Sequence, residues 1–264
     1  MYFSDKIVWI TGASSGIGKA LAIQLSKEDA TLVLSGRNLA ALEEVQQLCK
    51  HPDKIELVTL DLADYTNLSN AVSAVLEKLG TVDILINNGG ISQRALAKDT
   101  HISVDERIMN INYLGTIALT KALLPHFIEK QKGHFVVTTS VVGLIGTPYR
   151  SSYAASKHAL HGFFDSLRAE CYNDNIFVSL ICPGFVKTAI SLNALTGDGS
   201  PQQTMDVATE NGLDPSYFAK QMIKAIAQKK EEAYIAGTKE KFGIYLKRWF
   251  PKLFSLLVRK IKVT

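Results

Sequence analysis

Cysteine is scarce in this sequence of 264 residues, and its three cysteines form no Cys-x-x-Cys pair. So small and odd a set argues against a disulfide framework and against a cysteine-based metal site, and it indicates a reducing compartment. Glycine (18 residues) and proline (7 residues) are not enriched, which excludes collagen-like and low-complexity chains. A hydrophobic content of 47% with only 20% charged residues excludes intrinsic disorder.

Long apolar runs are absent as well. None reaches the roughly 18–20 residues that a membrane-spanning helix needs. The apolar stretch at 7–10 is too short for the core of a signal peptide. We therefore expect a cytoplasmic protein, and the length fits one large domain.

Positive charge is concentrated at one end of the chain. Residues 239–264 contain eight basic residues and one acidic residue, whereas the remainder carries a net charge of −3. A slightly acidic globule with a basic tail is not typical of a nucleic-acid-binding protein, so no nucleic-acid partner is expected.

Short runs rich in Val, Ile and Leu alternate with amphipathic segments. The runs predict strands at 6–11, 31–36, 54–60, 82–88, 134–140, 176–182 and 232–237. The segments predict helices near 17–27, 39–50, 66–79, 103–131, 152–173 and 215–229, with Asn38 and Thr66 as N-caps. This alternation predicts an α/β fold: a single-domain, doubly wound (Rossmann-type) parallel sheet with helices on both faces. We expect residues 1–238 to form the dinucleotide-binding and catalytic domain, followed by an amphipathic helical tail at 239–264.

The longest irregular stretch lies at 188–215. It contains Gly197, Gly199, Pro201 and Gly212 and no predicted strand. A loop of this length in a compact domain is usually functional, so we expect a mobile lid over the substrate. Its apolar residues are expected to line a pocket for a lipophilic substrate: Ile190, Leu192, Leu195 and Met205.

A glycine-rich turn follows the first predicted strand and opens a helix. The turn, which we expect to cradle a phosphate, includes Gly12, Ser14, Ser15, Gly16, Ile17 and Gly18. Backbone amides at a helix N-terminus bind a pyrophosphate well when no side chain intervenes. The alternative is a tight turn without a ligand.

Polar residues also follow the next three strands. Arg37 lies where an adenosine ribose binds in dinucleotide folds, and a guanidinium there can pair with a 2′-phosphate. Asp61 could meet the adenine amino group, and Asn87 and Asn88 could join adjacent strands and face a cofactor. The alternatives are a solvated arginine, a turn or N-cap aspartate and an ordinary Asn-Gly turn.

Tyr153 and Lys157 are spaced to share one helix face, where the ammonium would lower the pKa of the phenol from about 10. Such a phenol can donate a proton to a carbonyl oxygen. Ser140 ends the fifth predicted strand, where its hydroxyl could bind that oxygen, and Asn112 lies inside a helix, which disfavours Asn. A Tyr/Lys pair alone would more often be a surface contact, and Asn112 could be an ordinary helical residue.

Together these motifs resemble the short-chain dehydrogenase/reductase family over residues 5–240. The matching residues are Thr11-Gly12-xxx-Gly16-x-Gly18, Asp61, Asn87-Asn88-x-Gly90, Asn112, Ser140, Tyr153-x-x-Ser156-Lys157 and Pro183-Gly184-xxx-Thr188. The resemblance implies that Tyr153 transfers the proton, that Lys157 lowers its pKa and binds the nicotinamide ribose, and that Ser140 holds the substrate oxygen. It also implies that Asn112 positions a water molecule and that Thr188 contacts the carboxamide.

The resemblance further implies NADP(H) as the cofactor, because Gly36-Arg37 is similar to the NADP-preferring pattern. The implied cofactor contacts, beyond the glycine turn, are Arg37, Asn38, Asp61, Leu62, Asn88, Tyr153, Lys157, Pro183, Gly184, Val186 and Thr188. A narrower resemblance, in Asn193 to Thr196, Asp198 to Ser200 and Thr204 to Asp206, is to the member 7B-like branch of the family.

The expected function is oxidoreduction of a lipophilic carbonyl or alcohol substrate by a homodimer or homotetramer. The alternative is a nucleotide-bound regulatory or scaffold protein with little turnover, although retention of all four catalytic residues favours the enzyme. No metal is expected, because the histidines show no ligand spacing with thiols or carboxylates.

The tail combines apolar and basic residues. Its apolar residues recur at offsets of three and four: Phe242, Tyr245, Leu246, Trp249, Phe250, Leu253, Leu256 and Leu257. Pro251 should kink or break the helix. Aromatic residues and leucine opposite Lys and Arg are typical of a helix in a membrane interface. We expect either peripheral membrane association through this tail or packing of its apolar face on the protein or in an oligomer.

Overall fold

Seven parallel strands form the centre of the molecule, in the order β3-β2-β1-β4-β5-β6-β7. The structure, a computed structural model, describes residues 2–260. The strands are β1 (Ile7–Thr11), β2 (Thr31–Gly36), β3 (Ile55–Thr59), β4 (Ile84–Asn87), β5 (Gly133–Thr138), β6 (Ile176–Pro183) and β7 (Glu232–Ile235). They occupy the seven predicted positions, and the predicted Rossmann-type fold is confirmed.

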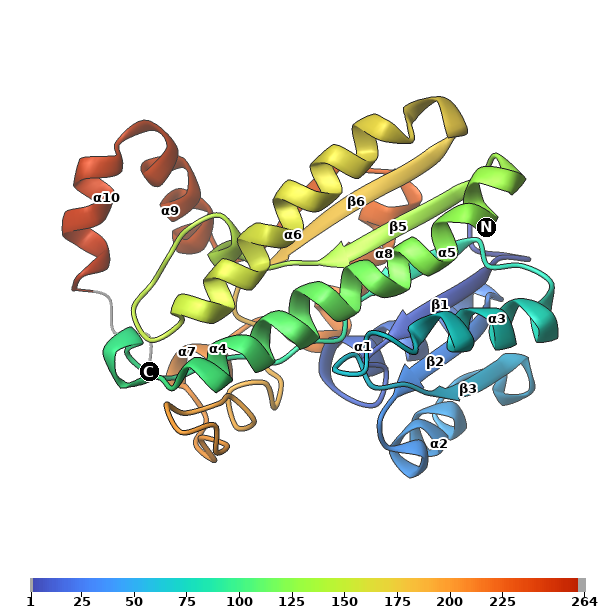
Figure 1. Cartoon of the computed structure of the whole chain (residues 1–264), viewed down its shortest axis with the longest axis horizontal. Helices are drawn as coiled ribbons and strands as arrows, with labels where there is room; N and C mark the ends of the chain where they lie inside the picture. The colour runs from blue at the N-terminus through green and yellow to red at the C-terminus, as the bar shows by residue number, and fades with distance from the viewer. Residues whose placement is uncertain (1, 261–264) are drawn as a thin grey trace.

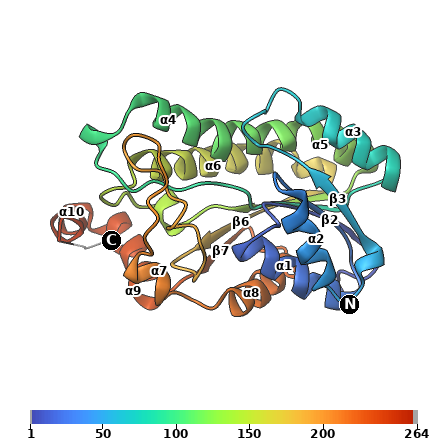
Figure 2. The ribbon, with the colours of Figure 1, turned by 90° about the horizontal axis from the view of Figure 1, so that it is seen from below.

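Helices cover both faces of the sheet, as Figure 2 shows edge-on. One layer contains α1 (Gly16–Leu25), α2 (Leu39–Gln47) and α8 (Pro215–Ala227). The other contains α3 (Leu68–Leu79), α4 (Ile102–Met109), α5 (Thr116–Lys130) and α6 (Ser151–Glu170). Each layer encloses its own apolar cluster against the strands, which explains why the strands are apolar on both faces.

The strand order reverses beside β1, which pairs with β2 on one side and β4 on the other. Because all strands run parallel, the loops after β1, β2, β4, β5 and β6 leave the same edge of the sheet (Figure 1). Ligands of open α/β folds bind at the carboxyl edge near such a reversal. The topology therefore brings the predicted site residues together.

The long helix predicted over 103–131 is interrupted. Between α4 and α5 the backbone forms a π-helical turn, Asn110–Gly115, which contains the buried Asn112. Short π-helical turns are frequent at functional sites because they change the direction of one side chain. The position of Asn112 within a helical stretch was predicted, but the change in helix type was not.

The two predicted N-caps differ in outcome. Asn38 caps α2 by accepting a hydrogen bond from the amide of Ala41, as predicted. Thr66 was predicted to cap α3, and this is wrong: α3 begins at Leu68, and the Thr66 hydroxyl donates instead to Asp64. A competing local hydrogen bond of this kind is common for Thr in a turn.

The segment 188–215 is irregular but closely held to the body. Its backbone pairs with other loops at Gln93–Leu195 and Val186–Leu213, and it contains the short helix α7 (Val207–Glu210). Ala194 is buried within it. Its mobility, and hence its role as a lid, stays a prediction.

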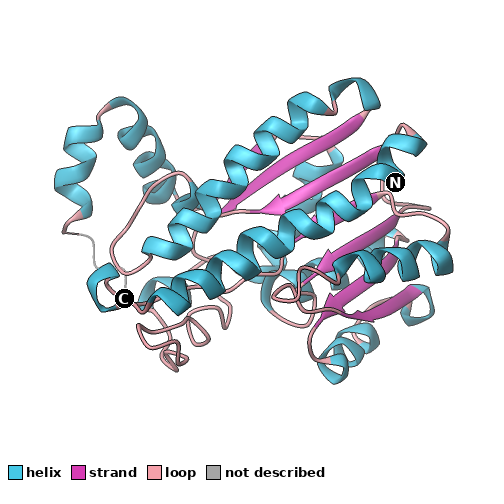
Figure 3. Cartoon of the chain, viewed as in Figure 1, coloured by secondary structure: helices cyan, strands magenta, loops and turns pink. Residues whose placement is uncertain are grey.

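The C-terminal segment forms two helices, α9 (Thr238–Trp249) and α10 (Pro251–Val258), which project from one end of the body (Figures 1 and 3). Pro251 separates them, as predicted. Ile244, Leu246 and Phe254 are buried in a small cluster of their own with Val141 and Ile145. Within residues 2–260, no helix combines the length and apolarity required to cross a membrane.

Candidate active site

The glycine turn after β1 depends on close backbone packing. A Cβ atom on Gly12 would lie 2.8 Å from the Cα of Gly89, and one on Gly18 would lie 2.2 Å from the carbonyl oxygen of Gly12. Gly12 and Gly16 also have backbone φ angles of +64° and +53°, which residues other than glycine rarely adopt. Glycine is therefore required at these positions by the backbone itself.

This turn borders a cleft of about 560 Å³ at the carboxyl edge of the sheet. The predicted cofactor residues that line it are Gly12, Ser14, Ser15, Gly16, Ile17, Arg37, Asp61, Leu62, Asn88, Tyr153, Lys157, Pro183, Gly184, Val186 and Thr188. Two predicted residues are not among its lining: Gly18, which packs against the turn, and Asn38, which caps α2. A Cβ on Gly16 would lie 3.2 Å from the Thr188 side chain, which is a tight contact.

Asn88 joins two central strands. Its Nδ2 group donates to the carbonyl of Thr11 at 3.0 Å, and its backbone amide donates to the Thr11 hydroxyl at 3.0 Å. Asn87 instead donates to Thr120 of α5. Asp61 both lines the cleft and closes a local turn by accepting from the amide of Ala63. Its position is therefore compatible with both predicted roles, contact with an adenine amino group and closure of a turn.

The four predicted catalytic residues come from three elements. Ser140 follows β5 and caps a short 3₁₀ turn, Tyr153 and Lys157 lie in α6, and Asn112 lies in the π-helical turn. Lys157 donates through Nζ to the carbonyl of Thr138 at 2.7 Å, and its Nζ lies 5.9 Å from the centre of the Tyr153 ring. These contacts place the ammonium beside the end of β5.

The Asn112 side chain makes three hydrogen bonds. Its Oδ1 accepts from the amide of Ile91 at 2.8 Å, and its Nδ2 donates to the Ile91 carbonyl at 2.9 Å and to Ser156 at 3.0 Å. A Cβ on Gly90 would lie 3.0 Å from Asn112 Oδ1 and 3.6 Å from Lys157 Nζ. Asn112 therefore fixes the loop after β4 against α6 beside the lysine.

The electrostatics of the Tyr153 phenol differ from the sequence expectation. Burial raises the pKa of Tyr153, and a hydrogen bond with Ser140 and the charges of Arg150 and Arg94 oppose that rise. Burial also lowers the pKa of Lys157 to about 8. The expected lowering of the phenol pKa by Lys157 is thus wrong for this structure, in which the pKa of Tyr153 is raised above its usual value.

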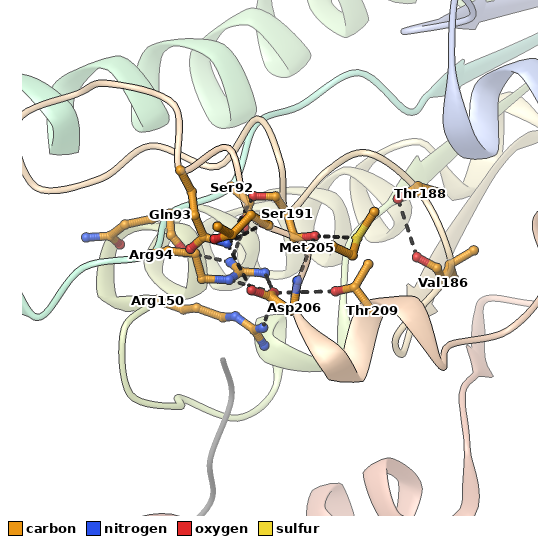
Figure 4. A network of polar contacts seen from close by, with 12 residues as sticks. Ser92, Gln93, Arg94, Arg150, Val186, Thr188, Ser191, Met205, Asp206 and Thr209 are labelled. Carbon is orange, nitrogen blue, oxygen red and sulfur yellow. Dashed lines mark hydrogen bonds and ion pairs between the residues drawn. The ribbon is translucent and has the colours of Figure 1, made fainter.

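A buried ionic cluster that the sequence did not predict lies next to Tyr153. Arg94 and Arg150 both form ion pairs with Asp206, and the three side chains are 4%, 5% and 1% exposed (Figure 4). Burial raises the pKa of Asp206, but hydrogen bonds from Arg94 and Gln202 and the two positive charges outweigh burial and lower it. The three residues stand far apart in sequence, so no local pattern distinguished them from surface charges.

This cluster ties the segment 188–215 to the body. Arg94 follows β4, Arg150 precedes α6, and Asp206 lies in the segment itself. Arg150 also stacks on the Phe185 ring, 5.2 Å from its centre. The cluster therefore fixes the segment beside the predicted catalytic residue Tyr153.

A second cavity, of about 640 Å³, opens beside the first. Ser140, Tyr153 and Ile190 line both. Much of the remaining wall is apolar: Val141, Val142, Ile145, Phe185, Val186, Leu213 and Phe254. Of the predicted pocket residues, Ile190 and Leu195 line the cleft, whereas Leu192 and Met205 line neither cavity. The Met205 sulfur instead accepts a hydrogen bond from Ser191 at 3.0 Å.

Three ligand-type side chains meet in the fold although their sequence spacing did not indicate it. Cys182 Sγ lies 3.8 Å from His161 Nε2 and 3.7 Å from Glu232 Oε1. The other Glu232 oxygen accepts from the Tyr234 hydroxyl. His161, Cys182 and Glu232 belong to α6, β6 and β7 respectively, and Cys182 lies within hydrogen-bonding distance of the other two.

A dinucleotide-sized cleft beside a Ser, Tyr and Lys group defines the class of nucleotide-dependent oxidoreductases. The family model described as short chain dehydrogenase matches residues 6–197, so the chain belongs to the short-chain dehydrogenase/reductase family.

Proteins of similar sequence indicate which branch of the family this chain resembles. The chain is 43% identical to "Dehydrogenase/reductase SDR family member 7B" of Danio rerio, covering 95% of this chain and 83% of the relative. It is 44% identical to the Bos taurus protein of the same name, covering 97% and 81%. The resemblance to the member 7B-like branch is confirmed.

Solved structures share the fold. A short-chain dehydrogenase from Streptomyces avermitilis superposes with a TM-score of 0.82 at 26% identity, covering 98% of this chain and 97% of that one. A family member from Burkholderia phymatum in complex with NAD has a TM-score of 0.83 at 24% identity, covering 100% and 98%. An alcohol dehydrogenase from Thermococcus sibiricus complexed with 5-hydroxy-NADP has a TM-score of 0.73 at 25% identity, covering 87% and 95%.

Proposed function

We propose that the protein is an NADP(H)-dependent reductase of a lipophilic carbonyl compound, or oxidises the matching alcohol. One observation carries this proposal: Ser140 and Tyr153 line both the cofactor-type cleft and the more apolar second cavity. The proton-transferring group thus stands where a cofactor and an apolar substrate would meet.

The cleft fits a dinucleotide. The glycine turn leaves no room for a Cβ at Gly12, and the Ser15 side chain makes no capping hydrogen bond at the start of α1. Such a helix start favours a phosphate group. Gly16, Arg37 and Thr188 would hold the cofactor, which would supply or accept the hydride when bound.

Tyr153 would give its phenolic proton to the carbonyl oxygen during reduction. Burial raises its pKa, so the phenol is protonated at neutral pH, as a proton donor must be. The Ser140 hydroxyl would donate a hydrogen bond to the same oxygen and stabilise the negative charge that develops there. In the oxidation direction the phenolate would take the alcohol proton back.

The preference for NADP(H) rests on Arg37. It follows β2 and lines the cleft, and the adjacent Gly36 presents no carboxylate that would repel a 2′-phosphate. Related folds bind either cofactor type, since the Burkholderia protein was solved with NAD and the Thermococcus enzyme with 5-hydroxy-NADP. Arg37 favours the phosphorylated form in this chain.

A panel of hydrophobic and small polar ketones and aldehydes, assayed with NADPH and with NADH at the nicotinamide absorbance, tests this function. We expect faster turnover of the hydrophobic compounds with NADPH. Tight NADPH binding without turnover of any compound would support the alternative, a nucleotide-bound scaffold protein. Faster turnover of small polar ketones would contradict the lipophilic substrate.

Members of this family often form oligomers, and we propose a homodimer or homotetramer. Light scattering after size exclusion measures the mass directly. A monomer at assay concentration would contradict this part of the proposal.

A further inference from the structure

The C-terminal helices α9 and α10 have an inner face that belongs to the folded body. Ile244, Leu246 and Phe254 pack with Val141 and Ile145. Lys247 donates through Nζ to the carbonyl of Leu144 at 2.9 Å. The two helices are therefore held in place, and the predicted packing on the protein is realised by this face.

The outer face of the same helices is apolar and uncovered within the described chain. It consists of seven exposed side chains: Phe242, Tyr245, Trp249, Phe250, Leu253, Leu256 and Leu257. Among residues 2–260, these account for 7 of the 17 exposed large hydrophobic side chains, within a stretch of 16 residues. Trp249 alone is 73% exposed. Such a concentration marks an interaction surface rather than scattered surface residues.

Exposed basic residues flank and alternate with these apolar residues along the chain. Lys239, Lys241, Arg248, Lys252, Arg259 and Lys260 are exposed. No ion pair within the described residues involves any of them. Their charge is therefore available to an external partner of opposite charge.

The charge distinguishes between two occupants of this surface. A second copy of the chain would bring two strongly basic segments together, and like charges across an interface oppose association. An anionic bilayer complements both properties, because its headgroups attract Lys and Arg while its interface accepts Trp, Phe and Leu side chains.

We propose that α9 and α10 dock on an anionic phospholipid bilayer, with the outer apolar side chains in its interface. Helices of 12 and 8 residues joined at Pro251 suit a position in the plane of the surface.

The inner side of the same two helices forms part of the wall of the second cavity. Gly243 of α9 and Phe254 of α10 line that cavity together with Ser140 and Tyr153. We infer that a lipophilic carbonyl compound dissolved in the bilayer reaches Tyr153 past these helices. This second step rests on the proposed function, whereas the docking itself does not.

The two tryptophans offer a direct readout. Trp9 is fully buried in β1, so a change in tryptophan emission on addition of vesicles reports on the exposed Trp249. We expect a blue shift and co-sedimentation with vesicles of phosphatidylcholine and phosphatidylserine at low ionic strength. Both effects should weaken with pure phosphatidylcholine or with added salt.

Variants test which side chains act. The double variant Leu253→Ser/Leu256→Ser should bind anionic vesicles about tenfold more weakly or worse, because both residues belong to the outer face. The matched control Leu48→Ser/Tyr172→Ser removes two exposed apolar side chains elsewhere and should bind as the unchanged chain does. Thermal melts establish that both variants fold.

Three outcomes would overturn the docking: no vesicle binding at low salt, equal losses in both double variants, or a blue shift that follows protein concentration without vesicles. The last result would assign the face to a second copy. Tyr153→Phe should bind vesicles normally, so failure of the proposed chemistry and failure of docking are separable.

Access is tested by turnover. Leu253→Ser/Leu256→Ser should reduce a water-soluble ketone at the normal rate and a vesicle-dissolved ketone more slowly. Equal rates for both substrates would contradict access through the bilayer.

Discussion

The glycine turn after β1 and the segment 188–215 both border the active site, but they are shaped over different distances along the chain. In the turn, Gly12 and Gly18 approach each other within six residues, and the loop at Gly89 packs closely against Gly12. In the segment, Asp206 is held by Arg94 and Arg150, which lie 112 and 56 positions away. Local motifs therefore identify the cofactor side well and the substrate side poorly.

Tyr153 lines the cleft that both regions border, and the largest effect is expected there. Tyr153→Phe removes only the phenolic oxygen and should reduce turnover by about 10²–10⁴-fold, because the proton donor is lost. NADPH binding, measured by fluorescence titration, should be retained. A variant that kept more than about a tenth of the rate would show that another group donates the proton.

The second largest effect is expected in the segment 188–215, where removal of the buried charge of Asp206 should lower the free energy of unfolding. Asp206→Asn leaves the Arg94 guanidinium buried without the carboxylate that it pairs with, which typically costs about 3–5 kcal/mol in the free energy of unfolding. Hydrogen exchange in 188–215 should also accelerate, because the segment loses its attachment.

The matched control for Asp206→Asn is Glu210→Gln, which removes an exposed carboxylate of α7 in the same segment. Its effect on unfolding should stay within about 0.5 kcal/mol. Equal effects of the two substitutions, measured by denaturant unfolding, would mean that the ionic cluster does not hold the segment.

The cofactor side is expected to respond to Arg37→Ala through affinity rather than stability. A charge-assisted hydrogen bond is typically worth about 1.5–3 kcal/mol, so NADPH should bind roughly ten- to a hundredfold more weakly. NADH binding should be almost unchanged, because it lacks the 2′-phosphate. Calorimetry with both cofactors measures the difference, and equal losses would make Arg37 a structural residue.

A smaller effect, on the pH dependence of the free energy of unfolding, is expected from the buried core residue His134. Burial lowers the pKa of His134 from 6.5 to about 3. As the pH falls, the unfolded chain therefore binds the proton before the folded chain does. The free energy of unfolding is unaffected by His134 above pH 6.5 and decreases below it. At about pH 4.5, two units below the unfolded pKa, the loss should be roughly 2.7 kcal/mol.

His134→Gln should flatten the stability profile in that pH range. The exposed His101→Gln is the matched control, because it also removes one imidazole. Denaturant unfolding at a series of pH values gives both curves, and parallel curves for the two variants would contradict the assignment to His134.

Several features were predictable because they depend on neighbouring residues. The seven strands are continuous apolar runs, Asn38 caps α2 within three positions, and Pro251 separates α9 from α10. Thr66 was mispredicted because two conformations compete locally, and the hydrogen bond to Asp64 replaced the cap. Leu192 and Met205 were mispredicted as pocket residues because an irregular segment has no period from which side-chain direction can be inferred.

Residue type and spacing alone predicted the sheet and the glycine turn, and they placed Ser140 at a strand end and Tyr153 and Lys157 on one helix face. Only the tertiary structure decided the direction of the Tyr153 pKa shift, since burial raises the pKa and outweighs the opposing hydrogen bond with Ser140 and the opposing charges of Arg150 and Arg94. It also decided which face of the tail is buried. Periodicity places Leu246 and Trp249 on one helix face, but contact with the body covers the first and leaves the second exposed.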